Sequence, residues 1–291
     1  MNGIINIYKE KGYTSFDVVA ILRKKLWIKK IGHTGTLDPD AEGVLPVCIG
    51  KATKVVDLIT DKTKRYKAIV KLGITTTTED ASGEVIETRD VVFDEDKIKE
   101  AAMSFKGEYD QTPPMYSALK VNGKKLYEYA REGKVIERKS RLVNIIDIEI
   151  TKFLPPDRFE IDVKCSKGTY IRTLCVDIGE KLGCGAHMEY LLRTEVGSFK
   201  LEDALKLDEV EKLVKAEKVE DHLVKVDEVF DYEKLVVPKE LNKYLYNGNK
   251  IITDKEIGTK YKVYDFEDKF IGVYIVVQED KIYLRPQKMF I

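Results

Sequence analysis

The chain has 291 residues, of which 43% are hydrophobic and 34% are charged. This composition is typical of a soluble globular protein with one large domain, or with one large and one small domain. The sequence has no run of about 18 apolar residues and does not open with a basic segment followed by an apolar block, so we expect neither a membrane helix nor a signal peptide. Four cysteines without Cys-x-x-Cys spacing argue against a structural zinc site or a disulfide framework, and they fit a reducing cytoplasm.

Charge is balanced over the whole chain but not along it. Fifty basic residues match fifty acidic ones, yet residues 117–141 have a net charge of +5 and residues 202–233 a net charge of −7. Such segregation allows one face of a neutral molecule to attract phosphate, although charge runs are also typical of solvated helix faces. The neutral net charge and the lack of an apolar interface stripe favour a monomer.

The periodicity of apolar residues predicts a mixture of strands and helices in the first two thirds of the chain. Strict alternation indicates half-buried strands, and apolar residues three or four apart indicate helices. The irregular order of the two favours an α+β fold with a mixed, mainly antiparallel sheet. The expected strands are 4–8, 66–72, 143–151 and 158–165; the expected helices begin at Thr14 or Ser15, span 95–105 after an Asp94 cap, and begin near Ile171.

The sequence pattern of the last third of the chain changes near residue 232. The acidic segment 202–233 is poor in glycine and is expected to be helical, whereas the residues after it form short β-rich runs with tight turns. We therefore expect a main domain over 1–232 and a small β-rich domain over 233–291. Its expected strands are 260–266, 270–277 and 282–286, and a short helix is expected between Pro238 and Gly248.

The most unusual segment is 32–50, which contains four glycines, two prolines, one histidine and three carboxylates. A loop this constrained is costly to order and is typical of segments that position a functional group. Within it, Asp38 lies between Leu37 and Pro39, and the proline biases the residue before it towards extended backbone. Asp38 is thus a candidate nucleophile or general base. The alternative is an ordinary Asp-Pro turn that starts a helix at Pro39.

Other candidate residues are spread along the chain. His33 precedes Asp38 by five residues, but the three histidines have no metal-ligand spacing, so we expect no metal site. No phosphate-binding, dinucleotide or serine-hydrolase motif occurs, and no cofactor is expected. Tyr66 lies among Lys64, Arg65 and Lys67, a pattern that suits stacking on an unpaired base. Tyr170 and Arg172 open the helix near 171, where a guanidinium can pair with a carboxylate.

These segments together resemble the TruB family of bacterial tRNA pseudouridine-55 synthases. The resemblance covers essentially the whole chain, and its five motifs stand in the right order at compatible spacings. They are GHTGTLDPDAEG at 32–43, KRYKA at 64–68, LGITTTTEDASGEV at 72–85, PPMYSALKVNGKKLYEYAREG at 113–133 and CSKGTYIRTLCVDIGEKLGCGAHMEYLLRT at 165–194.

The resemblance implies a pseudouridine synthase fold in which Asp38 is the catalytic aspartate and Arg172 pairs with it. It also implies that His33, Tyr66, Tyr170 and Leu191 surround a uridine flipped out of the tRNA T-loop. Segment 113–141 is similar to an insertion that clamps the T-arm stem-loop, and the tail after 232 is similar to a PUA-type RNA-binding domain. The cationic residues expected to contact RNA in that insertion are Lys120, Lys124, Lys125, Arg131, Arg138, Lys139 and Arg141.

Isomerising uridine needs one ionised carboxylate and no external group or cofactor. We expect Arg172 to lower the pKa of Asp38 and orient it. Two other functions stay open at this point. A non-catalytic tRNA-binding or folding chaperone would use the same scaffold, but it would not need a constrained carboxylate. A glycoside hydrolase would need a second carboxylate about 5–10 Å away, for which Asp40 and Glu42 are candidates on spacing alone.

Overall fold

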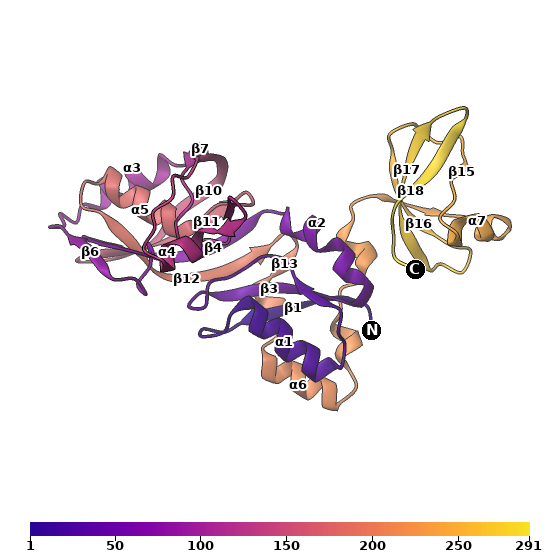
Figure 1. The fold of residues 1–291 in the computed structure, drawn as a ribbon, viewed down its shortest axis with the longest axis horizontal. Coiled ribbons are helices and arrows are strands. Elements are labelled where there is room, and N and C mark those ends of the chain that lie inside the picture. Colours follow the sequence, from indigo (N-terminus) through magenta and orange to yellow (C-terminus); the bar gives the residue numbers. More distant parts are fainter.

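The computed structural model describes all residues from 1 to 291. The main part of the chain, shown in Figure 1, is built around one long twisted sheet. Its elements are β1 (Gly3–Lys9), α1 (Ser15–Leu26), β2 (Ile31–His33), β3 (Glu42–Ile49), α2 (Val56–Thr60), β4 (Lys64–Leu72), β5 (Ile74–Thr76), β6 (Val85–Thr88), α3 (Glu95–Met103), β7 (Gly107–Gln111), β8 (Lys120–Val121), β9 (Lys124–Lys125), α4 (Leu126–Arg131), β10 (Arg141–Leu154), β11 (Arg158–Cys165), α5 (Ile171–Lys181), β12 (Ala186–Val196), β13 (Phe199–Lys200) and α6 (Leu207–Lys215).

The sheet has nine strands, with the order β1-β3-β12-β4-β11-β10-β7 and with β2 and β13 attached to β3 and β12. Every pair is antiparallel except β3 with β12, so the fold class is the α+β fold expected from the sequence. The parallel pair meets at Gly43 and Arg193. A Cβ atom on Gly43 would lie 2.2 Å from the carbonyl oxygen of Arg193, and its φ is +107°, so only glycine permits this approach.

Both halves of the sheet carry helices on the same face. On the β1–β3 half, α1 packs its buried Val18, Val19 and Leu22 against the strands, and α6 adds Leu207 and Val210 to the same cluster. On the other half, α3 and α5 cover β4, β10 and β11 through a 23-residue cluster. The expected start of α1 is confirmed: the Thr14 hydroxyl accepts a hydrogen bond from Asp17 N, and the Asp17 carboxylate accepts one from Thr14 N.

The C-terminal residues form a separate five-stranded sheet with the order β14-β16-β17-β18-β15, which stands apart from the long sheet in Figure 1. Three aromatic side chains join it to the main part: Phe230 packs on Phe270 and Phe290 with ring centroids 6.2 and 6.0 Å apart. The elements are β14 (Glu233–Val236), α7 (Asn242–Tyr246), β15 (Ile251–Ile252), β16 (Lys260–Tyr264), β17 (Phe270–Gln278) and β18 (Ile282–Met289). The division near 232 stays a prediction.

Two expectations about local structure are wrong. Residues 202–233 are not one helical segment, because α6 is their only α-helix and the rest is irregular with short 3-10 turns. The segment returns twice to the edge strand β1, where Leu205 and Val224 form bridges with Ile7 and Ile4 and so cover that edge. No helix starts at Pro39 either. We find no helix in the structure that has both the length and the apolarity to cross a membrane.

Candidate active site

The loop that carries Asp38 connects β2 to β3 and is tied down on both sides of the carboxylate. Leu37 is buried, and its N–H and carbonyl both bond to the hydroxyl of buried Ser15 at the start of α1, at 2.9 and 3.2 Å. On the other side, the carbonyl of Pro39 accepts hydrogen bonds from Gly12 N and from Lys9 Nζ, at 2.9 and 3.0 Å. The backbone on either side of Asp38 is therefore fixed, as catalysis by positioning requires.

Pro39 stands in a tight turn, closed by a hydrogen bond of 3.1 Å from Ala41 N to Asp38 O. Because Pro39 sets its own φ and restricts the residue before it, the turn also limits the backbone of Asp38. Only residues 34–41 of the segment 32–50 form a positioning loop; the expectation of a loop over the rest is wrong, because β2 ends at His33 and the buried strand β3 covers Glu42–Ile49.

Arg172 joins Asp38 to two other segments. Its Nε lies 3.1 Å from Asp38 Oδ2, and its terminal nitrogens donate to the carbonyls of Thr78 and Tyr116, both at 2.8 Å. Asp80 Oδ2 lies 3.7 Å from the same guanidinium. The structure thus brings Asp38 and Arg172 into contact, although they are far apart in the sequence, and it ties them to the start of the 113–141 insertion through Tyr116.

The electrostatics of Asp38 differ from the expectation in one respect. Burial raises the pKa of Asp38 above the usual aspartate value, and the nearby Asp80 carboxylate adds to this, whereas Arg172 and Lys9 oppose it. The cost of desolvating the carboxylate outweighs its attraction to the guanidinium. Arg172 therefore limits the rise in the pKa of Asp38 rather than lowering it below the usual value.

One row of paired residues crosses five strands beneath this loop: Lys9, Gly43, Arg193, Tyr66 and Val163. Paired residues in a sheet point to the same face, so Lys9, Arg193 and Tyr66 share the face on which Asp38 lies. Leu191, two residues before Arg193, is paired with Ala68 on that face.

The charge of Asp38 contributes to a raised pKa of Tyr66 and of Tyr170, although burial is the larger cause for both. Both phenols therefore interact electrostatically with the Asp38 carboxylate. His33 is the last residue of β2, and its Nδ1 accepts a hydrogen bond from Gly35 N at 3.3 Å. Burial and the nearby Arg193 lower the pKa of His33, so the imidazole is neutral at pH 7, with its proton assigned to Nε2.

Tyr170 is held by a residue that the sequence did not reveal. Gln111, at the end of β7, is buried and donates to the carbonyl of Tyr170 at 2.9 Å while accepting from its N–H at 2.8 Å. This amide satisfies both backbone groups of the residue that precedes α5. Gln111 thereby fixes the point from which Tyr170 and Arg172 project.

Arg193 and Lys9 are the other residues that sequence reasoning missed. Arg193 is buried, has no carboxylate partner, and donates to the carbonyls of Val44, Gly35 and Thr36. Lys9 is fully buried among carbonyl oxygens, and burial lowers its pKa to about 8. Their alignment in one row follows from strand register, which no short motif records.

The cations around Tyr66 do not line the site. Arg65 and Lys67 lie on the opposite face of β4, where Arg65 Nε pairs with Asp162 at 2.6 Å, and Lys64 is buried against the carbonyls of Thr60 and Lys62. Arg65 and Lys67 therefore do not share a surface with Tyr66, and a contact of these cations with RNA phosphate stays a prediction.

The second carboxylate of a glycoside hydrolase is also missing from the expected positions. Glu42 adjoins Gly43 on β3, so it points to the other face, where it accepts a hydrogen bond from Tyr8 at 3.1 Å. Asp40 lies within the turn and is exposed. Neither residue contacts Arg172.

The 113–141 insertion holds its cations in two different ways. Several of them are used within the insertion: Lys124 pairs with Glu132, Lys125 and Arg131 lie over the Tyr127 ring, and Arg138 donates to the carbonyl of Pro113 at 3.0 Å. Lys120, Lys139 and Arg141 are exposed and have no carboxylate within 4.0 Å. These three are the cations most available to an anionic partner.

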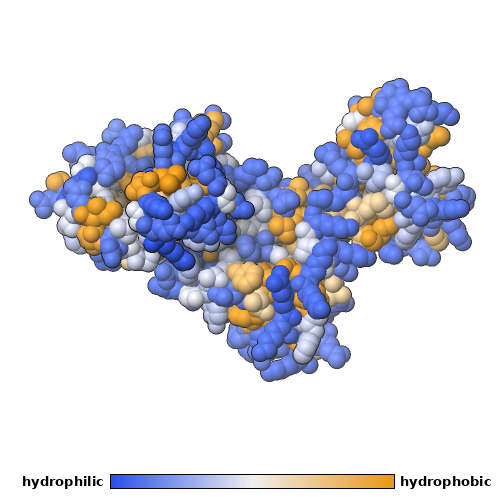
Figure 2. All heavy atoms as spheres, viewed as in Figure 1, coloured by the Kyte–Doolittle hydropathy of each residue, from blue (hydrophilic) through white to orange (hydrophobic).

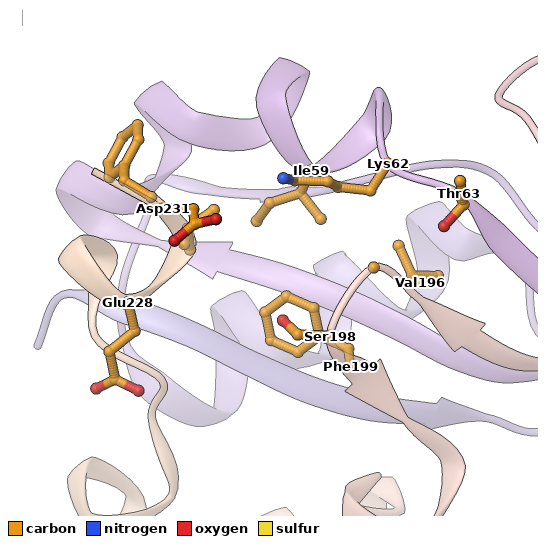
Figure 3. Close-up of a pocket in the computed structure, with 11 residues that line it drawn as sticks. Ile59, Lys62, Thr63, Val196, Ser198, Phe199, Glu228 and Asp231 are labelled. Atoms are coloured by element: carbon orange, nitrogen blue, oxygen red, sulfur yellow. The ribbon is translucent and has the colours of Figure 1, made fainter. Parts of the chain in front are cut away.

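An open pocket of about 420 Å³ lies elsewhere, at the junction with the C-terminal sheet. Figure 3 shows it between Ile59 and Lys62 on one side and Phe199 on the other, with Asp231 and Glu228 at its edge. None of the residues expected to be functional lines this pocket. Its lining does not combine a nucleophilic side chain with a general base that would suit the chemistry outlined above. We therefore place the candidate active site at Asp38.

Comparisons with known proteins show which family shares this sequence and fold. The model of the TruB family pseudouridylate synthase N-terminal domain matches residues 23–171, and that of the tRNA pseudouridylate synthase B C-terminal domain matches residues 172–241. Proteins named tRNA pseudouridine synthase B are similar over nearly their whole length. One from Lachnoclostridium phytofermentans is 53% identical over 100% of both chains, and one from Bacillus subtilis is 42% identical over 99% of this chain and 97% of the relative.

Among solved structures, the crystal structure of a Cbf5-Nop10-Gar1 complex contains a chain that is 27% identical, with a TM-score of 0.74 over 99% of this chain and 85% of that one. A chain in an H/ACA RNP bound to a substrate RNA containing 2′-deoxyuridine is 25% identical, with a TM-score of 0.72 over 99% and 85%. Fold and relatives together define an RNA pseudouridine synthase, an isomerase that acts on tRNA. The chain belongs to the TruB family.

Proposed function

We propose that this protein converts uridine 55 in the T-loop of tRNA to pseudouridine, with Asp38 as the catalytic carboxylate. The observation that carries the proposal is the contact of Asp38 with Arg172 on a loop whose backbone is tethered on both sides. The relatives named tRNA pseudouridine synthase B support the substrate class.

The reaction breaks the N1–C1′ glycosidic bond of uridine, turns the base, and forms a C5–C1′ bond. The proton on C5 is lost and N1 gains one, so the product is an isomer and nothing is oxidised or reduced. The chemistry needs an anion at the reacting nucleotide, either to attack carbon or to remove a proton. Asp38 supplies it, because 40% of its side chain is open to solvent while Arg172, only 6% exposed, approaches it from within the protein.

A base in a folded T-loop is inaccessible, so the uridine must leave its stack. That costs a few kcal/mol. Tyr66 and Leu191 are buried side chains on the sheet face that carries Asp38, Tyr170 projects from the start of α5, and neutral His33 follows at the end of β2. We propose that these four side chains hold the flipped base. All of them come from one chain, which supports a functional monomer.

The exposed cations of the insertion, Lys120, Lys139 and Arg141, are proposed to contact the phosphates of the T-arm. Arg141 lies close enough to Tyr170 to influence its pKa, which places this end of the insertion beside the site. The C-terminal sheet is proposed to bind RNA outside the T-arm, as a PUA-like domain.

The test is to treat an unmodified tRNA transcript with the purified protein and to map pseudouridine by nucleotide position. Tritium release from 5-labelled uridine gives the rate of the same reaction. We expect one equivalent of tritium per tRNA and pseudouridine at position 55. Pseudouridine at another position would contradict the site assignment, and tight tRNA binding without tritium release would favour a chaperone.

A further inference from the structure

One flank of helix α1 carries aromatic and cationic side chains that are exposed at the surface. Phe16, Arg23 and Trp27 recur at spacings that place them in one stripe along the helix, and Lys24 lies beside the stripe. Phe16 is 63% exposed and Trp27 is 92% exposed. We call the surface formed by Phe16, Arg23, Lys24, Trp27, Lys29 and Lys30 the α1 flank.

The N-terminal end of the α1 flank lies next to the candidate active site. Helix α1 begins at Ser15, whose hydroxyl anchors the Asp38 loop. The other side of the helix faces α6, where Lys25 pairs with Glu211, whereas Arg23 on the flank donates to the carbonyl of Ile31 in β2 at 2.9 Å. Strand β2 ends at His33, directly before the Asp38 loop, so Arg23 ties the flank to the strand that leads into this loop. Figure 1 shows α1 running beside β1 and β3, with α6 beyond it.

The flank is strongly cationic. Residues 16–30 contain five basic residues and one acidic residue, Asp17, which is used in the N-terminal cap of α1. Lys24, Lys29 and Lys30 are exposed, and no carboxylate lies within 4.0 Å of them. Figure 2 shows apolar side chains at the surface around α1 among hydrophilic ones. Aromatic rings between unpaired cations are the arrangement that binds nucleic acid by stacking and by phosphate contacts.

The backbone of Trp27 is a second, independent indication. Trp27 ends α1 with φ +55° and ψ +33°, a left-handed conformation that favours glycine and is unusual for a bulky residue. Its ring is almost fully exposed, so packing within the protein does not compensate for this strain. Residues held in such sparsely populated backbone conformations cluster at functional sites.

We infer that the α1 flank is an RNA-binding surface that contacts the tRNA outside the T-loop while uridine is bound at Asp38. The twelve residues of α1 extend about 18 Å from the Asp38 loop, so Trp27 meets nucleotides well away from the target base. The three lysines contact phosphates, and the Trp27 ring stacks on an unpaired base or a ribose. This inference rests on the proposed function, because it assumes a tRNA substrate.

Trp27 is the only tryptophan of the chain, so its fluorescence reports on the flank directly. Titrating the full-length protein with an unmodified tRNA transcript should quench this fluorescence with the same Kd that filter binding gives. The variant Trp27→Gly should raise that Kd about fivefold or more, without lowering the midpoint of thermal unfolding, because glycine suits the left-handed conformation. If Trp27 had only a structural role, the variant would lower the midpoint of thermal unfolding and leave the Kd for tRNA unchanged.

The triple variant K24A/K29A/K30A should weaken tRNA binding about tenfold at low salt and reduce the slope of log K against log salt by up to about 0.9 per lysine. The matched control is K67A/K71A/K164A, which removes three lysines from the opposite face of the sheet and should change neither quantity.

Unquenched fluorescence, together with an unchanged Kd and slope in both flank variants, would overturn the inference. If the protein still forms pseudouridine in that case, the proposed function stands and only the flank is wrong. If no tRNA forms pseudouridine, the proposed function itself fails. Self-association that disappears in Trp27→Gly would show that the flank binds a second copy of the chain instead.

Discussion

Arg172 contacts Asp38 from within the protein, and the outer side of the carboxylate stays free. The guanidinium is fixed by the carbonyls of Thr78 and Tyr116, so it cannot follow the carboxylate if that moves towards a substrate. The arrangement orients a carboxylate that folding has already partly removed from water. Because the desolvation raises the pKa of Asp38, the site holds a more basic carboxylate than one in water.

The pH dependence of the reaction should reflect this. Asp38 must be ionised to act, so the rate should fall as pH drops through its raised pKa, above the usual aspartate value of about 3.9. The Asp80 carboxylate contributes to that rise. Asp80→Asn should therefore lower the pKa of Asp38 and move the acid limb of the single-turnover rate to lower pH. The amide oxygen can still accept the hydrogen bonds that Asp80 Oδ1 receives from Thr78 and Ser82.

A matched control for that measurement is Asp177→Asn. Asp177 lies in α5, and burial raises its pKa to about 6, so its own titration could distort the profile. The control should leave the position of the acid limb unchanged. A shift to higher pH in Asp80→Asn would contradict the electrostatic account of the site.

Gln111 is expected to act on the reaction through Tyr170. Gln111→Ala leaves the N–H of Tyr170 without its partner, while the carbonyl of Tyr170 keeps its bond from Leu174 N, so the free energy of unfolding should fall by about 1–3 kcal/mol. The single-turnover rate should fall while the Kd for tRNA changes by less than about threefold. The control Tyr109→Phe removes only the third partner of the Gln111 amide. Equal effects of the two variants on the rate would argue against a role of Gln111 in positioning Tyr170.

The exposed cations of the insertion should account for much of its salt-dependent affinity. K120A/R141A/K139A should reduce the slope of log K against log salt for tRNA binding by up to about 0.9 per contact. Replacing Lys124 and Arg138 should have a smaller effect on the slope, because both already have partners in the protein. The opposite ranking would mean that the internal contacts open when RNA binds.

Deleting the residues after 232 should weaken binding of full-length tRNA more than binding of a T-arm stem-loop. The truncated chain should be less soluble, because Phe230 packs on Phe270 and Phe290 and the deletion exposes its ring. Replacing Phe230 with serine in the truncated chain should restore its solubility. If the truncated protein unfolds cooperatively and yet does not modify the stem-loop at saturating concentration, the separation of chemistry from the C-terminal sheet is wrong.

Local features were the most predictable from the sequence. The cap of α1 at Thr14 and the alternation of β10 and β11 depend on neighbours within a few residues. Strand β7 was missed because it is a polar edge strand with the sequence GEYDQ. The acidic segment was mistaken for a helix because its return to the β1 edge is a tertiary interaction, which propensity does not contain.

The candidate site divides in the same way. The Asp38 loop shows its constraint in its glycines and prolines, and the pairing of Asp38 with Arg172 came from the family resemblance rather than from spacing. Arg193, Lys9 and Gln111 could not be found, because their contacts with the loop and with Tyr170 depend on strand register. Desolvation raised the pKa of Asp38 against expectation, since burial cannot be read from a single sequence.

The account is tested most directly by measuring pseudouridine formed at position 55 of a tRNA transcript, under single-turnover conditions, by the wild-type protein and by Asp38→Asn. We predict that the variant forms none while its Kd for tRNA stays within about tenfold, or about 1.4 kcal/mol, and that Asp40→Asn in the same loop retains the wild-type rate. A wild-type rate in Asp38→Asn would contradict the central claim that Asp38 is the catalytic carboxylate.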